Sequence, residues 1–403
     1  MPMASFPIHP VSRFEQTQTS IKRPRELLCF SFDEKHHCTP FSTESLRYYY
    51  PPYVQAPGTF IPSVDLTLGF PEWIKGDDSV DGHLDALLET VQAHEEQRVH
   101  EGHPIGDVRV QADIVTWRGM MTKIMTAMFD VYSEFEMNAT CYQGTIYIEE
   151  DHASKQADER RGKTKPPRPA EVPQEVMQYW GYKFETVSTL SKPWGESSRA
   201  EIESRDLETV NNNVQYCSIV RTGIGDSSLL LAGEVDCVLG EKPENPELPI
   251  PWVELKTSAE PPSDSFHERQ KFERKMLRFW AQSFLLGVPT VVVGFRTTNG
   301  LLSRIAEFET QKIPGIVARG ERSWNGNVCI SFTAAFLEFL KHELGGKEGV
   351  WRIQRKKNSK EIRVYQIAEK GTGEMLPAAF KEHRDRLIAA EIASKLGGTS
   401  MVD

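Results

Sequence analysis

The sequence has no apolar run near the roughly 18 residues that a membrane-spanning helix needs. Its first stretch, MPMASFPIHPVSRFEQ, lacks the apolar core of a secretory signal. We therefore expect neither a membrane span nor a secreted protein. Cysteine is scarce too, and its lack of CxxC spacing favours reduced thiols in an intracellular protein over disulfides or a zinc site. The cysteines are Cys29, Cys38, Cys141, Cys217, Cys237 and Cys329.

Positive charge is also in short supply. The net charge is −10 and the pI is about 5.7, which argues against a protein that coats nucleic acid through a general basic field. An enzyme that grips one RNA or DNA end in a local basic pocket remains compatible with this charge. The 403 residues, 39% of them hydrophobic, would fill one large domain or two ordinary ones. We expect a single catalytic domain over residues 1–403.

The stretch Leu229–Ser258 contains the most informative charged residues. It predicts two strands joined by a proline-rich loop. The first, Leu229–Leu239, is apolar on both faces except for Glu234 and Asp236. The second, Trp252–Thr257, carries an acid and a base, which are Glu254 and Lys256. Side chains two apart on a strand share a face, so each pair is expected to point one way.

Carboxylates on a buried strand are rarely tolerated without a partner. A divalent cation would resolve the repulsion, and Mg²⁺ and Mn²⁺ prefer oxygen ligands. The pattern acid-x-acid followed by acid-x-Lys is typical of metal-dependent phosphodiester hydrolases, in which the lysine positions the attacking water or the scissile phosphate. The alternative is a solvated amphipathic hairpin in which Lys256 pairs with Glu234.

Arg118 falls on the apolar face of a predicted helix, Asp113–Val131. A guanidinium cannot shed its proton, so an arginine among core residues needs an anion. That anion is either the acid of a structural ion pair or a substrate phosphate, which suits the planar fork of arginine. The arginine alone does not decide between the two.

Two further polar residues are candidates for the same site. The alternating stretch Cys141–Glu150 predicts a strand, and Glu149 is the candidate fourth acidic ligand, with Glu150 as its rival and simple solvation as the alternative. Ser265–Leu286 predicts a helix with capping-box spacing at its start and Gly287 after its end. Gln282 of this helix would either bond to backbone or orient a water.

Three segments are expected to lie outside the packed core: residues 1–20 as a flexible lead-in, residues 151–175 as an exposed charged loop, and residues 396–403 as a loose tail. Spacing predicts further elements. They are helices at Asp78–Ala93, Thr333–Leu344 and Leu376–Lys395, strands at Leu27–Phe32, Met177–Thr186, Tyr216–Thr222 and Thr290–Arg296, and a hairpin over Val350–Ile367. The hairpin is rich in basic residues, which are either solvated or part of an RNA or protein interface.

Several short stretches, taken in order, resemble the DXO family of eukaryotic RNA 5′-end decapping enzymes. They are RPRELLCFSFD near the start, TWRG at Thr116–Gly119, GTIYIEE at Gly144–Glu150, GYKFE at Gly181–Glu185, GEVD at Gly233–Asp236, ELK at Glu254–Lys256 and QSFLLGVP at Gln282–Pro289. Each stretch alone is weak, but their shared order over residues 20–300 is specific.

The resemblance implies a role for each matching residue. Arg118, with its neighbours Trp117 and Gly119, would contact the phosphates of the 5′ nucleotide, and Cys217 would line the nucleotide pocket. Lys256 and Gln282 would hold the nucleophilic water or the scissile phosphate. The implied metal ligands are Glu149, Glu234, Asp236, Glu254 and the Leu255 carbonyl, and Glu234, Asp236 and Glu254 are also implied in catalysis.

The resemblance also implies a mixed α/β fold of two mixed sheets flanked by helices, with a restriction-nuclease-like core. The implied activity uses one or two Mg²⁺ or Mn²⁺ ions to remove pyrophosphate, an unmethylated cap dinucleotide or a NAD cap from defective RNA 5′ ends. The 5′-monophosphate product would feed 5′→3′ decay, so a nuclear 5′→3′ exoribonuclease is the expected partner and the nucleus the expected location. The alternatives are a distributive 5′→3′ exoribonuclease of the same family and a non-catalytic partner that stabilises such an exoribonuclease.

Overall fold

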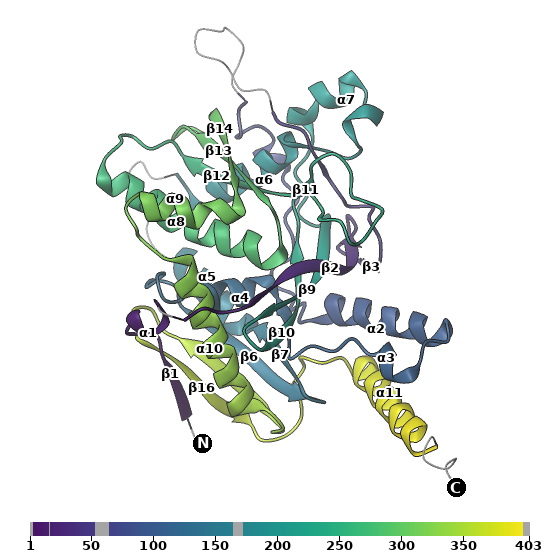
Figure 1. Cartoon of the computed structure of the whole chain (residues 1–403). Coiled ribbons are helices and arrows are strands. Elements are labelled where there is room, and N and C mark those ends of the chain that lie inside the picture. The colour runs from purple at the N-terminus through teal and green to yellow at the C-terminus, as the bar shows by residue number, and fades with distance from the viewer. Residues whose placement is uncertain (1–2, 16, 53–63, 164–171, 398–403) are drawn as a thin grey trace.

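The computed structural model describes residues 3–15, 17–52, 64–163 and 172–397. Within them the chain forms a mixed α/β structure with two mixed β-sheets and helices packed against both (Figure 1), which confirms the expected fold class. The larger sheet has the order β1-β16-β15-β6-β7-β5-β10-β9-β2-β3, and the smaller has β14-β13-β12-β11-β4-β8.

The elements follow one another along the chain with these bounds. The larger sheet consists of β1 (Met3–Pro7), β2 (Ile21–Phe32), β3 (Cys38–Pro40), β5 (Ile114–Trp117), β6 (Phe135–Tyr142), β7 (Thr145–Glu150), β9 (Gln215–Ile224), β10 (Ser227–Glu234), β15 (Val350–Arg355) and β16 (Glu361–Ala368). The smaller consists of β4 (Tyr48–Tyr49), β8 (Thr189–Leu190), β11 (Cys237–Val238), β12 (Trp252–Ala259), β13 (Thr290–Arg296) and β14 (Leu302–Glu309). The α-helices are α1 (Ser12–Glu15), α2 (Asp85–His100), α3 (Ile105–Val108), α4 (Arg118–Thr126), α5 (His152–Lys163), α6 (Gln174–Val187), α7 (Arg199–Glu203), α8 (Phe266–Leu286), α9 (Ile313–Arg319), α10 (Gly326–Leu344) and α11 (Ala378–Gly397).

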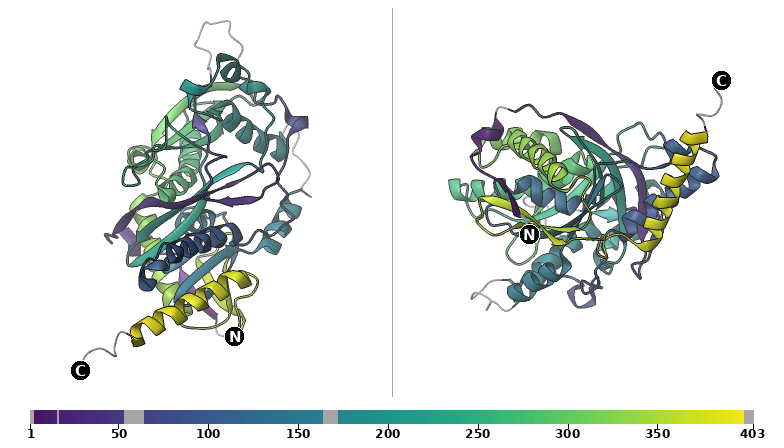
Figure 2. Two further views of the ribbon diagram at one scale, coloured as in Figure 1. Left: turned by 90° about the vertical axis from the view of Figure 1, so that its right-hand side faces the viewer. Right: turned by 90° about the horizontal axis from the view of Figure 1, so that it is seen from below.

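The hydrophobic core is divided into three layers by the two sheets. The largest apolar cluster lies between the sheets and includes buried residues of α4, α8 and α10. A second cluster covers the other face of the larger sheet with residues of α2 and α11, which lie side by side in the left view of Figure 2. A third covers the other face of the smaller sheet with residues of α6. The two sheets are therefore held together by one shared core.

The expected strand Leu229–Leu239 is divided between the two sheets. β10 ends at Glu234 in the larger sheet, and the chain re-enters strand structure as β11 in the smaller one. The side chain of Asp236 accepts a hydrogen bond from the Leu255 amide, with Oδ2 2.6 Å from the nitrogen. The prediction that Glu234 and Asp236 lie on one face of one strand is thus wrong. They instead flank the point where the chain crosses between sheets.

Two other predicted elements are also wrong, because local spacing fitted more than one structure. Only Arg118–Thr126 within the predicted helix Asp113–Val131 is helical: Ile114–Trp117 forms β5, which pairs in parallel with both β7 and β10. The predicted strand Met177–Thr186 lies within the helix α6, whose buried side chains recur at helical spacing. The α6 helix buries Tyr179, Trp180, Phe184 and Val187.

For other predicted elements the type is correct and only the ends differ from the observed ones. The predicted helices at Asp78–Ala93 and Thr333–Leu344 are the observed α2 and α10 with shifted ends. The expected exposed loop over residues 151–175 contains the helix α5, residues 164–171 lie outside the described part of the chain, and so do residues 398–403 of the expected tail. The helix α8 is confirmed, with Ser265 capping its start and Gly287 left-handed after its end. Strand β13 and the hairpin β15–β16 are also confirmed.

Residues 3–15 are folded, contrary to the expected flexible lead-in. β1 pairs with β16 at the edge of the larger sheet, and Phe6, Ile8 and Phe14 are buried. The Phe6 ring contacts the rings of Phe332 and Phe336 on α10, with centroids 5.7 and 5.4 Å away. Burial of these few large side chains is what orders a segment whose overall composition looked loose.

Replacing Phe6 with alanine is therefore expected to lower the free energy of unfolding by about 3–5 kcal/mol, the usual cost of truncating a buried phenylalanine. Met3→Ala is the matched control, because Met3 lies on the same strand and is 60% exposed; it should change stability by less than about 0.5 kcal/mol. Urea denaturation measures both. Equal small effects would show that β1 is not packed as described.

Candidate active site

Acidic side chains gather where the chain passes from the larger sheet to the smaller one. Glu234 ends β10, Asp236 precedes β11, and Glu254 lies on the adjacent strand β12. β11 pairs with β12 only as far as Val253, so the edge of β12 from Glu254 onward faces this junction. The larger and smaller sheets thus each contribute carboxylates to one place.

Glu254 is buried between two cations. Its Oε2 lies 3.2 Å from the Arg118 guanidinium and its Oε1 lies 2.6 Å from the Lys256 ammonium. Burial alone would raise the pKa of Glu254, but the two cations outweigh burial and hold the pKa below its ordinary value. Glu254 is therefore ionised. Of the two anions considered for Arg118, the acid of an ion pair is the one present in this structure.

Lys256 is shared among several acceptors. Besides Glu254, its Nζ lies 3.8 Å from Asp236 Oδ2 and donates to the Leu255 carbonyl at 3.1 Å. Burial opposes its charge, but Glu254 and Asp236 outweigh this and raise its pKa. The predicted pairing of Lys256 with Glu234, as in a solvated hairpin, is not formed.

For Glu234 and Asp236 the same cations do not outweigh burial and the neighbouring acids. Burial, and next the charge of Asp236, raises the pKa of Glu234 to about 7. Burial raises the pKa of Asp236 to about 6, even though Lys256 and the Leu255 amide act against it. The ionised form of both side chains is thus disfavoured by burial and by the negative charge of the neighbouring acids.

Glu185 belongs to this group and was missed in the sequence. It lies on α6, which packs against β12 from the outer side of the smaller sheet. Burial, followed by the charges of Asp236 and Glu234, raises its pKa well above the ordinary value. The signal was present, since Glu185 ends the GYKFE stretch, but that stretch was interpreted as a strand.

Glu149 lies elsewhere, which corrects its proposed role as the fourth acid. Its carboxylate is 3.0 Å from Nδ1 of His83, and burial raises its pKa to about 7, with His83, Asp81 and Asp85 as its charged neighbours. Its rival Glu150 forms an ion pair with Lys123. On β7 the side chain of Glu149 shares the face of Tyr147, which packs in the cluster on the α2 side of the sheet. Glu185 therefore replaces Glu149 as the candidate.

The remaining predicted residues surround the junction to different degrees. Arg118 begins α4, and Gly233 is what lets it approach: a Cβ on Gly233 would lie 3.0 Å from Arg118 Cβ and 2.9 Å from Leu286. Cys217 is buried opposite Glu234 in the β9–β10 register.

Within the described residues, three other predicted residues form no hydrogen bond or ion pair with the acids. Trp117 donates from its indole nitrogen to the His83 carbonyl at 2.8 Å. Gly119 is the second residue of α4, with open space where a Cβ would stand. Gln282 is partly exposed on α8, and in the described chain no hydrogen bond joins it to the acids.

The donor chemistry of this junction fits a divalent cation. Within the described residues it combines four carboxylates (Glu185, Glu234, Asp236 and Glu254) with two cations, Arg118 and Lys256. The carboxyl groups outnumber the cationic groups by two, and hard oxygen donors are what Mg²⁺ and Mn²⁺ prefer. As they stand, no three acidic, His or Cys side chains of the described chain are close enough together to ligate one ion; Lys256 instead contacts two of the acids.

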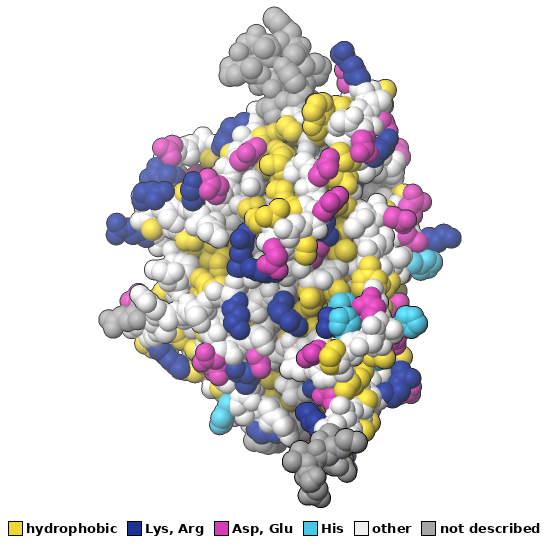
Figure 3. All heavy atoms as spheres, turned by 45° about the vertical axis from the view of Figure 1, so that its right-hand side comes forward, with side chains coloured by type: hydrophobic (Ala, Val, Ile, Leu, Met, Phe, Trp, Pro, Cys, Tyr) yellow, Lys and Arg dark blue, Asp and Glu magenta, His cyan; other side chains and the backbone are white. Residues whose placement is uncertain are grey.

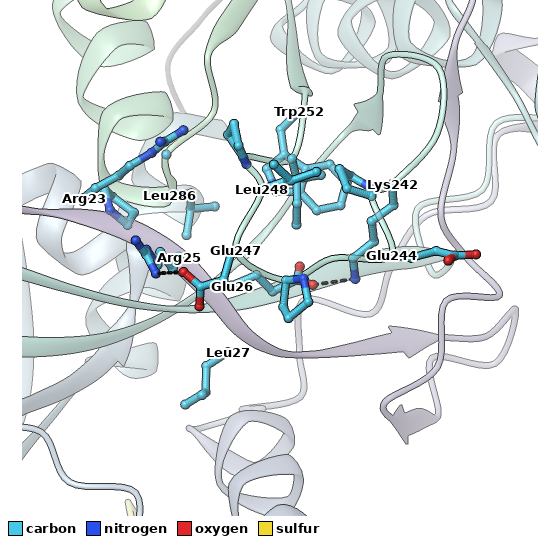
Figure 4. A pocket seen from close by; sticks show the side chains of 16 residues that line it. Arg23, Arg25, Glu26, Leu27, Lys242, Glu244, Glu247, Leu248, Trp252 and Leu286 are labelled. Atoms are coloured by element: carbon cyan, nitrogen blue, oxygen red, sulfur yellow. Dashed lines mark hydrogen bonds and ion pairs between the residues drawn. The ribbon is translucent and has the colours of Figure 1, made fainter.

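A neighbouring pocket of about 260 Å³ is distinct from this junction. It lies between β2 and the proline-rich loop that precedes β12, with Trp252 and Leu286 in its wall (Figure 4). Its charged side chains largely neutralise one another, because Arg25 pairs with Glu247 and Lys242 with Glu26. The pocket therefore lacks the unbalanced charge that marks the acid cluster.

Comparison with known proteins gives one consistent result. A profile described as RAI1 like PD-(D/E)XK nuclease matches residues 22–381. The protein named decapping nuclease RAI1 of Emericella nidulans is 50% identical over 382 residues, which cover 94% of this chain and 98% of that protein. The decapping and exoribonuclease protein of Mus musculus is 37% identical, covering 79% and 75%. Candida albicans Rai1, solved in complex with pU5 and Mn²⁺, has a TM-score of 0.81 at 27% identity and covers 96% of this chain and 100% of that one.

Proposed function

Because the chain belongs to the family of RAI1 like PD-(D/E)XK nucleases, we propose that the carboxylates at the sheet junction form its catalytic centre. The protein is a hydrolase of RNA 5′ ends that uses divalent metal ions. The observation that carries the site assignment is the excess of buried and half-buried carboxylates over cations where β10 of the larger sheet leads into β11 of the smaller one. We infer one catalytic unit over the whole chain.

The four acids would hold the ion together with the Leu255 carbonyl. Mg²⁺ and Mn²⁺ both suit this donor set, as one ion or two. When bound, the ion supplies a nucleophilic hydroxide at neutral pH and neutralises charge on the attacked phosphate. Glu254 has a second role, because it fixes Arg118 and Lys256 beside the ion by direct ion pairs.

The two cations stabilise the transition state from the protein side. Arg118 offers its planar guanidinium to the phosphates of the leaving group, and Lys256 offers its ammonium to the scissile phosphate. Gln282 of α8 would orient water or phosphate through its amide. Attack occurs at the phosphate that carries the first RNA nucleotide, so the products are 5′-monophosphate RNA and the released group.

The released group is pyrophosphate, an unmethylated cap dinucleotide or a NAD cap moiety, which gives the protein a role in mRNA quality control. Local rather than general positive charge suits this recognition of a single end. On the face shown in Figure 3, Lys and Arg side chains are interspersed with acidic and hydrophobic ones and form no continuous basic surface.

End-group analysis tests the function. Purified protein is incubated with 5′-triphosphate, unmethylated-capped and NAD-capped RNA, with Mn²⁺, with Mg²⁺ and with a chelator. We expect 5′-monophosphate RNA only with a divalent ion, and none with Glu234→Ala or Asp236→Ala. Glu247→Ala, an exposed acid in an ion pair with Arg25, is the control and should match the wild type. Unchanged ends with the wild type, or equal turnover by all variants, would refute the proposal.

A 5′→3′ exoribonuclease activity at the same site is the second candidate, favoured by the 37% identity to a protein named for both activities. The same acids would then hydrolyse the bond after the first nucleotide. Release of mononucleotides from 5′-monophosphate RNA identifies this activity, and intact 5′-monophosphate RNA after prolonged incubation excludes it.

We also propose a nuclear location and association with a 5′→3′ exoribonuclease, including a stabilising role that could accompany catalysis. None of the described helices is long and apolar enough to cross a membrane. Trp194 and Leu207 are large apolar residues that are 68% and 78% exposed on either side of α7. Co-purification with a nuclear exoribonuclease that Trp194→Ala weakens, together with nuclear fluorescence of a tagged protein, would support both proposals. Cytoplasmic fluorescence without co-purification would refute them.

A further inference from the structure

Three cations are held along one face of β12, namely Arg118 of α4, Lys256 of β12 itself and Lys275 of α8. Glu254, Lys256 and Ser258 alternate along the strand and so share a face, about 7 Å apart from one to the next. Glu254 contacts Arg118, Lys256 carries its own ammonium, and Ser258 accepts a hydrogen bond from Lys275 at 3.0 Å. The strand positions that hold the cations are therefore spaced about as far apart as neighbouring phosphates of an extended single strand.

The third cation, Lys275, differs from the first two because no acid of the described residues forms an ion pair with it. Arg118 and Lys256 both pair with Glu254, whereas no ion pair involves Lys275 in the described chain. Lys275 is only partly exposed, and its hydrogen-bond partner Ser258 is 3% exposed. An ammonium that is fixed by a neutral hydroxyl and lacks a carboxylate is prepared for an external anion.

The charges around Lys275 are mostly of its own sign. Burial, then Lys271 and Arg296, lowers the pKa of Lys275, and Glu268 acts weakly against them. Lys271 lies one helical turn before it on α8, and Arg296 ends the neighbouring strand β13. Gln282 lies two turns after Lys275 on the same helix face. Lys275, Lys271 and Arg296 therefore form a basic group near the Ser258 end of the β12 face on which Glu254 and Lys256 lie.

We propose that Lys275, held by Ser258, binds the RNA phosphate that follows the scissile one on its 3′ side. The proposal rests on the function inferred above, since it requires the 5′ end of the RNA to lie at the acid cluster. The strand β12 would then place successive phosphates at Lys256 and Lys275. Lys275 thus recognises the polynucleotide body, whereas the acid cluster and Arg118 act on its 5′ end.

Binding of 5′-monophosphate oligouridylates of one and five nucleotides, with Ca²⁺ in place of Mn²⁺, tests the proposal. For Lys275→Met we expect about a tenfold loss of affinity for the pentanucleotide, the scale of one charge-assisted hydrogen bond, and less than a twofold change for the mononucleotide. The slope of log K against log salt for the pentanucleotide should fall by about 0.7, the value for one phosphate contact of a single strand. Lys275→Arg should restore both.

Arg274→Met is the matched control, because Arg274 is exposed on the same helix and donates a hydrogen bond to the neutral side chain of Gln270. It should leave the affinity and the salt slope of the wild type. Equal losses for the mononucleotide and the pentanucleotide, or a Lys275→Met protein indistinguishable from Arg274→Met, would overturn the inference. Failure of the proposed function shows differently, as wild-type protein that leaves the 5′ ends of triphosphate RNA unchanged.

Discussion

Glu185→Gln is expected to lower the turnover of 5′-triphosphate RNA about 10³-fold, whereas Glu149→Gln stays within about tenfold of the wild type. Losing one carboxylate from the cluster removes several kcal/mol of metal-based stabilisation of the transition state, and about 4 kcal/mol corresponds to 10³ in rate. Glu185 interacts electrostatically with Glu234, Asp236 and Lys256, and Glu149 pairs with His83 instead. Steady-state rates of 5′-monophosphate formation measure both variants.

The two variants control each other. Both replace a carboxylate of raised pKa by a neutral isostere, so a general loss of folding would affect both, and thermal unfolding checks this. Similar rates for the two proteins would remove Glu185 from the catalytic group, and a greater loss in Glu149→Gln would return that role to the strand β7.

The second large effect is a gain of stability that accompanies a loss of activity. In the presence of a chelator, Glu234→Gln and Asp236→Asn should each stabilise the fold while abolishing hydrolysis. The folded pKa of Glu234 is about 7 and that of Asp236 about 6, above their ordinary values of 4.5 and 3.8. Folding then binds protons, so the free energy of unfolding falls as pH rises from about 4.5 to about 7. Neutral side chains remove that fall, which amounts to a few kcal/mol.

Glu254→Gln provides the opposite control at the same site. The pKa of Glu254 is held low by Lys256 and Arg118, so its charge stabilises the fold. Leaving two cations without their buried partner should cost about 3–5 kcal/mol. Urea denaturation with a chelator at pH 5 and pH 8 separates the cases. If all three variants shifted stability in one direction, or if Glu234→Gln kept the pH dependence of the wild type, the charge imbalance described here would be contradicted.

The sequence predicted those elements whose ends are set by nearby residues, such as a capping serine or a terminating glycine. The helix α8 was predictable because Ser265 caps its start and Gly287 takes the left-handed conformation after its end. The strand β5 was not, because the run Ile114–Trp117 continues an apolar spacing that also fits a helix. Its pairing between β7 and β10 depends on residues far along the chain.

The same limit explains which part of the site could be predicted. Glu254 and Lys256 stand two apart on β12 as expected, since a single strand places them. Glu185 could not be placed, because Tyr182 and Phe184 alternate in GYKFE as in a strand and only the wider spacing reveals α6. The position of Asp236 could not be predicted either, because it comes from the crossing between sheets and not from one strand. Glu149 ends a suitable run of residues but faces the side of the sheet where His83 lies.

Crystals soaked with Mn²⁺ and measured for anomalous scattering test the central assignment most directly. We predict a peak within reach of Glu185, Glu234, Asp236 and Glu254 that disappears in Glu185→Gln crystals and persists in Glu149→Gln crystals. A peak beside Glu149 and His83, or an empty sheet junction in the wild type at saturating Mn²⁺, would contradict the account.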